Sequence, residues 1–198
     1  MNFGDTFWLF LKVTFITFIS IDMAYIGWTR RQQWIAAYRD ISWKLMPINL
    51  MIFVATITLS VWLYQLSPEV FGLSWLNIFG AQSGNVYIMA ADVPYYGVLF
   101  CLLLFMVMPA VAEAEEHIFR KGTKTWKQGI KRSIIFGLVH MIVGIPLAAG
   151  IGLIIPGLFF TEMYFRGGTY LSTKAHFQHN LIVCILLLVL TLISNFAR

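Results

Sequence analysis

The chain contains several long apolar stretches with few charges, which are separated by more polar connections. A membrane-spanning helix needs about 20 such residues. The chain is 59% hydrophobic and 12% charged, whereas soluble domains are roughly 45–50% apolar and about 25% charged. Because 198 residues cannot bury this much apolar surface in a globule, we expect the bilayer to be the solvent. The stretches are continuous rather than alternating, which favours helices over a β-barrel.

The apolar stretches predict an all-α, polytopic transmembrane helical bundle of about six spans. Single spans are expected at about 6–28, 45–66, 95–114 and 177–196. The stretch 133–164 is too long for one straight span, so we expect two short helices that go out and return. Its helix breakers and small residues are Gly144, Pro146, Gly150, Gly152, Pro156 and Gly157. The first span has no basic leader and no small-residue cleavage site, so we do not expect a removed signal peptide.

Lys and Arg residues are distributed unevenly among the connections. The connections 29–44, 115–132 and 165–176 hold four, six and two of them, and 67–94 holds none. Because basic connections stay on the cytoplasmic side, we expect these three there and both termini on the opposite side. Within the connection that lacks Lys and Arg, 73–79 is expected to lie along the interface. The chain is thus predicted to be a multi-pass integral protein of a bacterial inner membrane or an equivalent organellar membrane, with 1–198 as one domain.

The two cysteines, Cys101 and Cys184, lie inside apolar stretches and are expected to be buried small hydrophobic residues. The sequence contains no Cys/His cluster, so it predicts no structural zinc site. The net charge of +5 follows the topology just described, so we expect membrane lipids as partners and no nucleic acid.

Two adjacent carboxylates, Glu115 and Glu116, end the third predicted span. On a helix they point in directions about 100° apart, so one of them is expected to turn into the bundle. Arg120 follows Glu116 by one helical turn, a spacing that favours an ion pair. Taken alone, such a cluster is also what ends an ordinary span at the interface.

Two further helices bring histidines to the same membrane face. His140 lies seven residues into the fourth stretch, one turn after Phe136. His176 and Asn180 open the last span, and their spacing places both on one helical face. Ionisable groups at membrane depth are costly, so a shared depth on three helices predicts a functional site. A carboxylate, two imidazoles and an amide are the groups that hydrolysis requires.

Three motifs in this region resemble those of the CPBP intramembrane protease family, also called Abi or CAAX prenyl endopeptidase and bacteriocin-processing proteins. The residues from Glu115 to Arg120 resemble its Glu-Glu-x-x-x-Arg motif, and those from Phe136 to His140 its Phe-x-x-x-His motif. His176 to Asn180 resembles the third motif, His-x-x-x-Asn, and 164–168 resembles the turn that precedes it. The family-like core covers about 95–196.

The resemblance implies an intramembrane endopeptidase that cuts a membrane-associated or lipidated peptide or protein near the cytoplasmic face. Glu115 would activate water with His140, and Glu116 would orient the site through Arg120. The oxyanion would be bound, or the site completed, by His176 and Asn180. Phe136 would support the site. Two histidines and a carboxylate, from Glu115, His140 and His176, are also compatible with one zinc ion.

A non-proteolytic membrane partner is the alternative, as an assembly factor, an immunity protein or a subunit of a membrane protein complex. The short chain and the compact basic connection favour this alternative. A transporter is the third option, since the fourth stretch is broken, but no inverted repeat is visible in the sequence.

Overall fold

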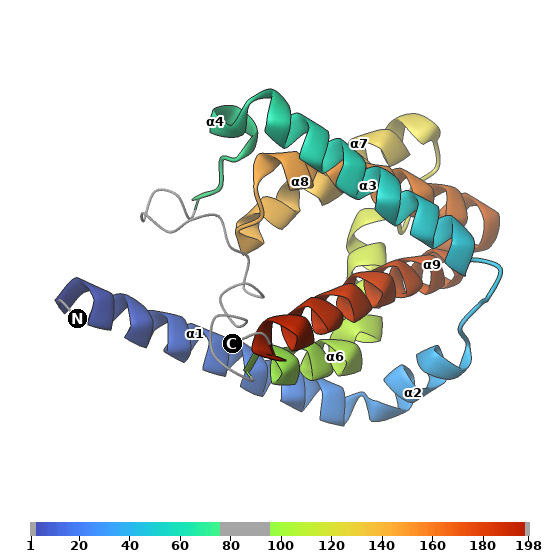
Figure 1. Ribbon diagram of the computed structural model, residues 1–198. Coiled ribbons are helices and arrows are strands. Elements are labelled where there is room, and N and C mark those ends of the chain that lie inside the picture. The colour runs from blue at the N-terminus through green and yellow to red at the C-terminus, as the bar shows by residue number, and fades with distance from the viewer. Residues whose placement is uncertain (1–2, 76–95, 197–198) are drawn as a thin grey trace.

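The computed structural model describes residues 3–75 and 96–196, and its regular elements there are all helices (Figure 1). None of the described residues lies in a strand, which confirms the predicted helical bundle. The elements are α1 (Phe3–Thr29), α2 (Arg31–Arg39), α3 (Met46–Leu66), α4 (Pro68–Phe71), α6 (Tyr96–Phe119), α7 (Trp126–Val139), the 3-10 helix η2 (His140–Val143), α8 (Leu147–Gly152) and α9 (Ile154–Phe196).

Three of the described segments are long and apolar enough to cross a membrane: Met46–Leu66, Tyr96–Phe119 and Leu147–Ile193. A shorter apolar helix covers Val13–Thr29. The third segment has 47 residues, about twice what one crossing needs. The number of crossings and the side on which the termini lie stay predictions from the sequence.

The long helix α9 is bent back on itself at two glycines. Gly167 and Gly168 have non-helical backbone angles, and Gly168 has a φ of +65° with a ψ of −161°. This combination is essentially restricted to glycine. The helix therefore consists of two arms, 154–166 and 169–196. The last span was expected to begin near 177, but its helix begins directly after the glycines, since residues of its first two turns are buried in the protein.

The fourth apolar stretch is broken, as predicted, but into more than the two expected helices: α7, η2, α8 and the first arm of α9. Helix α7 ends at Val139, η2 follows, and the chain turns at Gly144, whose φ is +87°. Helix α8 begins after Pro146, which lacks a backbone N–H and is tolerated at a helix start. Helix α7 begins seven residues earlier than the expected 133, at Trp126.

The polar backbone at this break is satisfied by residues from the segment that follows α4. The Ser74 hydroxyl donates to the carbonyl of Gly144 at 2.8 Å, and the Trp75 indole N–H donates to that of Ile142 at 2.9 Å. The Leu147 N–H donates to the Leu73 carbonyl at 2.9 Å. Of the segment 73–79 that was expected at the interface, 76–79 lies outside the described residues.

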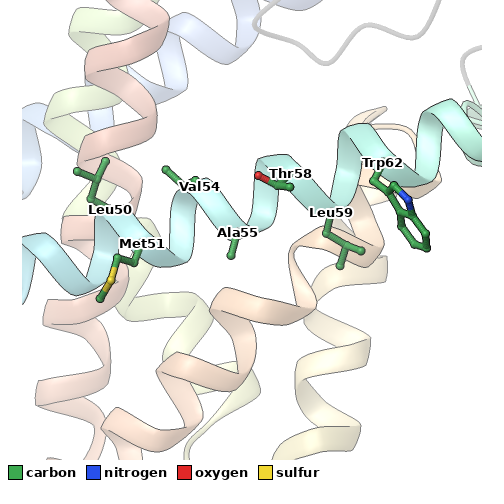
Figure 2. A pocket seen from close by; sticks show the side chains of 7 residues that line it. All are labelled: Leu50, Met51, Val54, Ala55, Thr58, Leu59 and Trp62. Atoms are coloured by element: carbon green, nitrogen blue, oxygen red, sulfur yellow. The ribbon is translucent and has the colours of Figure 1, made fainter.

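Helix α9 packs against α3, α6 and α7 and so forms the centre of the bundle (Figure 1). Helix α3 buries Asn49, Thr56 and Leu63, which are spaced by seven residues and share one face. Its opposite face carries an apolar hollow of about 660 Å³ (Figure 2). The hollow is lined by Leu50, Met51, Val54, Ala55, Thr58, Leu59 and Trp62. An apolar outer face of this kind is what lipid contact requires.

The basic connections meet at one end of the bundle. Lys174 of α9 lies 2.8 Å from the carboxylate of Asp40, which follows α2. Arg30 lies 3.9 Å from the carboxylate of Glu113 on α6. Connections that the charge pattern assigns to the same membrane face are thus joined by contacts between them.

Candidate active site

One predicted site residue, Glu115, contacts two others that come from separate elements. The Glu115 carboxylate of α6 lies between two imidazoles, with Oε2 3.3 Å from Nε2 of His176 on α9. Its other oxygen, Oε1, lies 3.9 Å from Nε2 of His140 on η2. The predicted convergence of a carboxylate and two histidines is therefore present in the structure.

The neighbouring carboxylate, Glu116, is fully buried, and both of its oxygens contact polar side chains. Its Oε1 lies 2.8 Å from Nδ1 of His176. Its Oε2 accepts a hydrogen bond from the Ser172 hydroxyl and lies 3.7 Å from Nε of Arg120. The predicted Glu116–Arg120 pair is confirmed, and Glu116 is the carboxylate that turns inward. The Glu115 side chain is 24% exposed and keeps access to the space beside it.

The Arg120 guanidinium is completely buried and packs closely against Gly157. It donates from Nη2 to the Gly157 carbonyl at 3.0 Å and lies 4.5 Å from the centre of the Phe136 ring. A Cβ added at Gly157 would lie 3.2 Å from Arg120 Nη2 and 3.1 Å from Cβ of Ser133. The positive charge is compensated by Glu116 and by the face of the aromatic ring.

Two phenylalanines enclose the histidines. The ring of Phe160 stacks on His176, with centroids 4.3 Å apart and planes at 18°. Phe136 meets His140 edge to face at 4.7 Å and His176 at 5.5 Å. Apolar rings on both sides exclude water, which strengthens the electrostatic contacts inside the site.

The orientation of the His140 ring is set by its own helix end. Nδ1 lies 2.7 Å from the carbonyl oxygen of Phe136. A carbonyl only accepts hydrogen bonds, so Nδ1 carries the proton and donates. In the neutral ring, Nε2 is then an unprotonated acceptor that faces Glu115. This explains why a phenylalanine carbonyl four residues earlier matters to the chemistry of the site.

Asn180 is the predicted site residue that the structure does not tie to the others. It lies half-buried on α9, one turn after His176. Within the described ranges 3–75 and 96–196 its amide makes no hydrogen bond. Its role as a partner of the oxyanion stays a prediction.

Three residues that support the site were missed by the sequence analysis as parts of it. Ser172 holds Glu116, Phe160 stacks on His176, and Gly157 leaves room for Arg120. Of these, only Ser172 carries a usable sequence pattern, since it precedes His176 by one turn on the same face.

The structure leaves untested the zinc ion predicted at Glu115, His140 and His176. Among the described residues, no set of three or more His, Cys, Asp and Glu side chains has an arrangement that could hold a metal ion. The two histidines face opposite oxygens of Glu115 rather than one shared point. Zinc binding at these residues stays a prediction from the sequence.

Comparison of the chain with protein-family models, with curated proteins and with solved structures found no match. The resemblance to the CPBP family therefore rests on the three motifs and on the contacts among their residues.

Proposed function

We propose that the protein is a CPBP-type intramembrane endopeptidase that hydrolyses a peptide bond of a membrane-associated or lipidated peptide or protein near the cytoplasmic face. The observation that carries the proposal is the position of Glu115, whose oxygens face His140 at 3.9 Å and His176 at 3.3 Å. A partly exposed carboxylate beside a fully buried ionic network is suited to act as a general base.

In the proposed reaction, a water molecule lies between Glu115 and Nε2 of His140, because both can accept its protons. As the water oxygen attacks the carbonyl carbon of the substrate, one proton passes to the Glu115 carboxylate. The resulting tetrahedral oxyanion collapses with cleavage of the C–N bond. The proton held by Glu115 passes to the leaving nitrogen, and the products are a carboxylic acid and an amine.

We propose that His176 positions Glu115 and does not contact the substrate, since its two nitrogens face Glu116 at 2.8 Å and Glu115 at 3.3 Å. The amide of Asn180 is assigned to the oxyanion, because it lies one turn further along the same face of α9. One amide donor of this kind contributes about 10²–10³-fold to the rate in other hydrolases.

The test compares peptides in the membranes of cells that contain the wild-type protein or Glu115→Gln. We expect defined peptides to be produced only with the wild type, and His140→Ala to behave like Glu115→Gln. Glu113→Gln is the matched control, because Glu113 lies on the same helix with its side chain 42% exposed and outside the site. Equal peptide pools in wild-type and Glu115→Gln membranes, with both proteins folded, would refute the proposal.

A non-proteolytic membrane partner is the second candidate, and one surface favours it. Four lysines on or beside the first half of α7 are exposed, and Trp126 among them is 47% exposed. They are Lys121, Lys124, Lys127 and Lys131. This surface would bind an anionic lipid surface or an acidic partner. Under this alternative, charge reversal at Lys124 and Lys127 abolishes the cellular phenotype while Glu115→Gln leaves it unchanged.

A further inference from the structure

Asn49, in the first turn of α3, has a side chain that is completely buried and has no hydrogen-bond partner. Its Oδ1 and Nδ2 atoms both make no hydrogen bond within the described part of the chain. Buried amides are nearly always paired, because an unpaired one loses its hydration without compensation. Thr56, on the same buried face, has its hydroxyl bonded to the Ile52 carbonyl at 2.8 Å. On this buried face of α3, the unpaired state is therefore particular to Asn49.

Two further unpaired polar atoms belong to neighbouring residues on the second arm of α9. The His179 ring lies against the backbone of Asn49, and its Nδ1 makes no hydrogen bond among the described residues. The neighbouring Gln178 donates from Nε2 to the Ser42 carbonyl at 3.1 Å, while its Oε1 is also unpaired. Polar atoms without partners thus occur both at the beginning of α3 and on the arm of α9, and these two helices pack against each other.

This polar group lies one aromatic ring away from the candidate active site. The ring of His179 meets that of Phe160 at 5.7 Å, and Phe160 stacks on His176 at 4.3 Å. His176 in turn contacts Glu115. A molecule held at Asn49 would therefore extend toward the reacting carboxylate.

A carboxamide presents a donor and an acceptor side by side, which is the complement of the carbonyl and N–H of a peptide backbone. We propose that Asn49 binds a backbone amide of the peptide substrate, with Gln178 and His179 completing this subsite. The proposal rests on the proposed protease function and names the contact on the α3 side of that site.

The subsite is closed in the present arrangement, because Asn49 is 0% exposed. A peptide reaches it when the first turns of α3 move away from α9. The outer face of α3 is apolar over Leu50, Met51 and Val54 (Figure 2), so lipid can accommodate such a movement. The substrate then enters from the membrane between these two helices.

The test is photo-crosslinking in membranes with the full-length Glu115→Gln protein, which binds without cleaving. A benzoylphenylalanine replaces Phe53, whose ring lies 6.2 Å from that of His179. We expect crosslinks to peptides, and a yield that falls about tenfold or more with Asn49→Leu, as expected for two lost hydrogen bonds. A probe at Trp62, on the lipid-facing side of α3, is the control and should not respond to Asn49→Leu.

Thermal unfolding separates a substrate contact from a structural one. We expect Asn49→Leu to keep or raise the unfolding midpoint, because it removes an unpaired buried amide. We expect Asn49→Ala to lose crosslinks as well, and its smaller side chain cannot clash with the peptide. Thr56→Val is the control, because it removes a buried hydroxyl that already has a hydrogen-bond partner. Three results would each overturn the subsite. The first is the absence of crosslinks from position 53, and the second is crosslinks that persist in both Asn49 variants. The third is an unfolding midpoint that falls together with the crosslinking yield. The protease function is tested separately, by comparing the peptides in membranes with the wild-type protein and with Glu115→Gln.

Discussion

Nδ1 of His176 lies 2.8 Å from Oε1 of Glu116, in a contact between residues that are 60 positions apart and both buried. The Ser172 hydroxyl and Arg120 meet the other oxygen of the same carboxylate. This pair fixes the ring whose second nitrogen faces Glu115. The arrangement of the candidate base therefore depends on a carboxylate that never meets solvent.

Glu116→Gln should destabilise the protein strongly, because it leaves the buried guanidinium of Arg120 without its counter-charge. Removing one partner of a buried ion pair costs about 3–5 kcal/mol. Thermal unfolding in detergent measures the loss. Glu113→Gln, which removes a half-exposed partner of Arg30 at 3.9 Å, is the control and should cost less than about 1 kcal/mol. Similar midpoints for both variants would show that Glu116 is not required in its charged form.

Ser172→Ala should lower both stability and turnover, since the hydroxyl donates to Glu116 and also contacts the Phe160 carbonyl at 3.0 Å. A hydrogen bond to a charged group contributes about 1.5–3 kcal/mol. Thr173→Ala, at the half-buried next position, should change unfolding by less than about 0.5 kcal/mol. If Ser172→Ala matches Thr173→Ala in turnover, Ser172 does not position the site.

Gly168→Ala should disturb the bend of α9. The φ of +65° and ψ of −161° at this residue disfavour any side chain, although no atom lies within 4 Å of an added Cβ. The cost is therefore one of backbone conformation, about 1–3 kcal/mol. Since the bend places Ser172 and His176, turnover should fall as well. An unchanged unfolding midpoint would mean that the bend tolerates a different local backbone.

The contact between Asp40 and Lys174 should make stability depend on pH in the acid range. Hydrogen bonds from Lys174 and Tyr170 hold the pKa of Asp40 below its ordinary value. The contribution is fully present above the unfolded-state pKa of about 4, and it is lost as the pH falls through the lower folded-state value.

The measurement is the difference in unfolding midpoint between wild type and Asp40→Asn from about pH 3 to pH 7. We expect the wild type to be more stable at neutral pH and the difference to shrink below about pH 4. Glu69→Gln, at an exposed position on α4, should show no such trend. A difference that grows as the pH falls would contradict the proposed cause.

Helix positions and the joining of the three motifs were predictable because each depends on local pattern. Continuous apolar stretches predicted α3 and α6 to within a few residues, except that α6 continues to Phe119. The four-residue spacing predicted the Glu116–Arg120 pair. Charge counting placed Glu115, His140 and His176 at one depth.

Other features could not be predicted, because they depend on contacts between distant segments. The segment 169–176 is polar enough to read as a connection, yet it is helical, and Ser172 and His176 are buried against α6 and the first arm of α9. The unpaired amide of Asn49 is likewise invisible in a sequence, where it is one polar residue in an apolar span. Only the packing of α3 on α9 shows that this amide is buried without a partner.

The bonds from Ser74 to Gly144 and from Trp75 to Ile142 have a consequence for the order of assembly. His140 begins the turn that these bonds hold, and their donors come from the first half of the chain. During synthesis, that turn cannot be secured until both halves have entered the membrane and met. Newly inserted protein would thus lack this turn, and His140 would meet Glu115 only after both segments are in place.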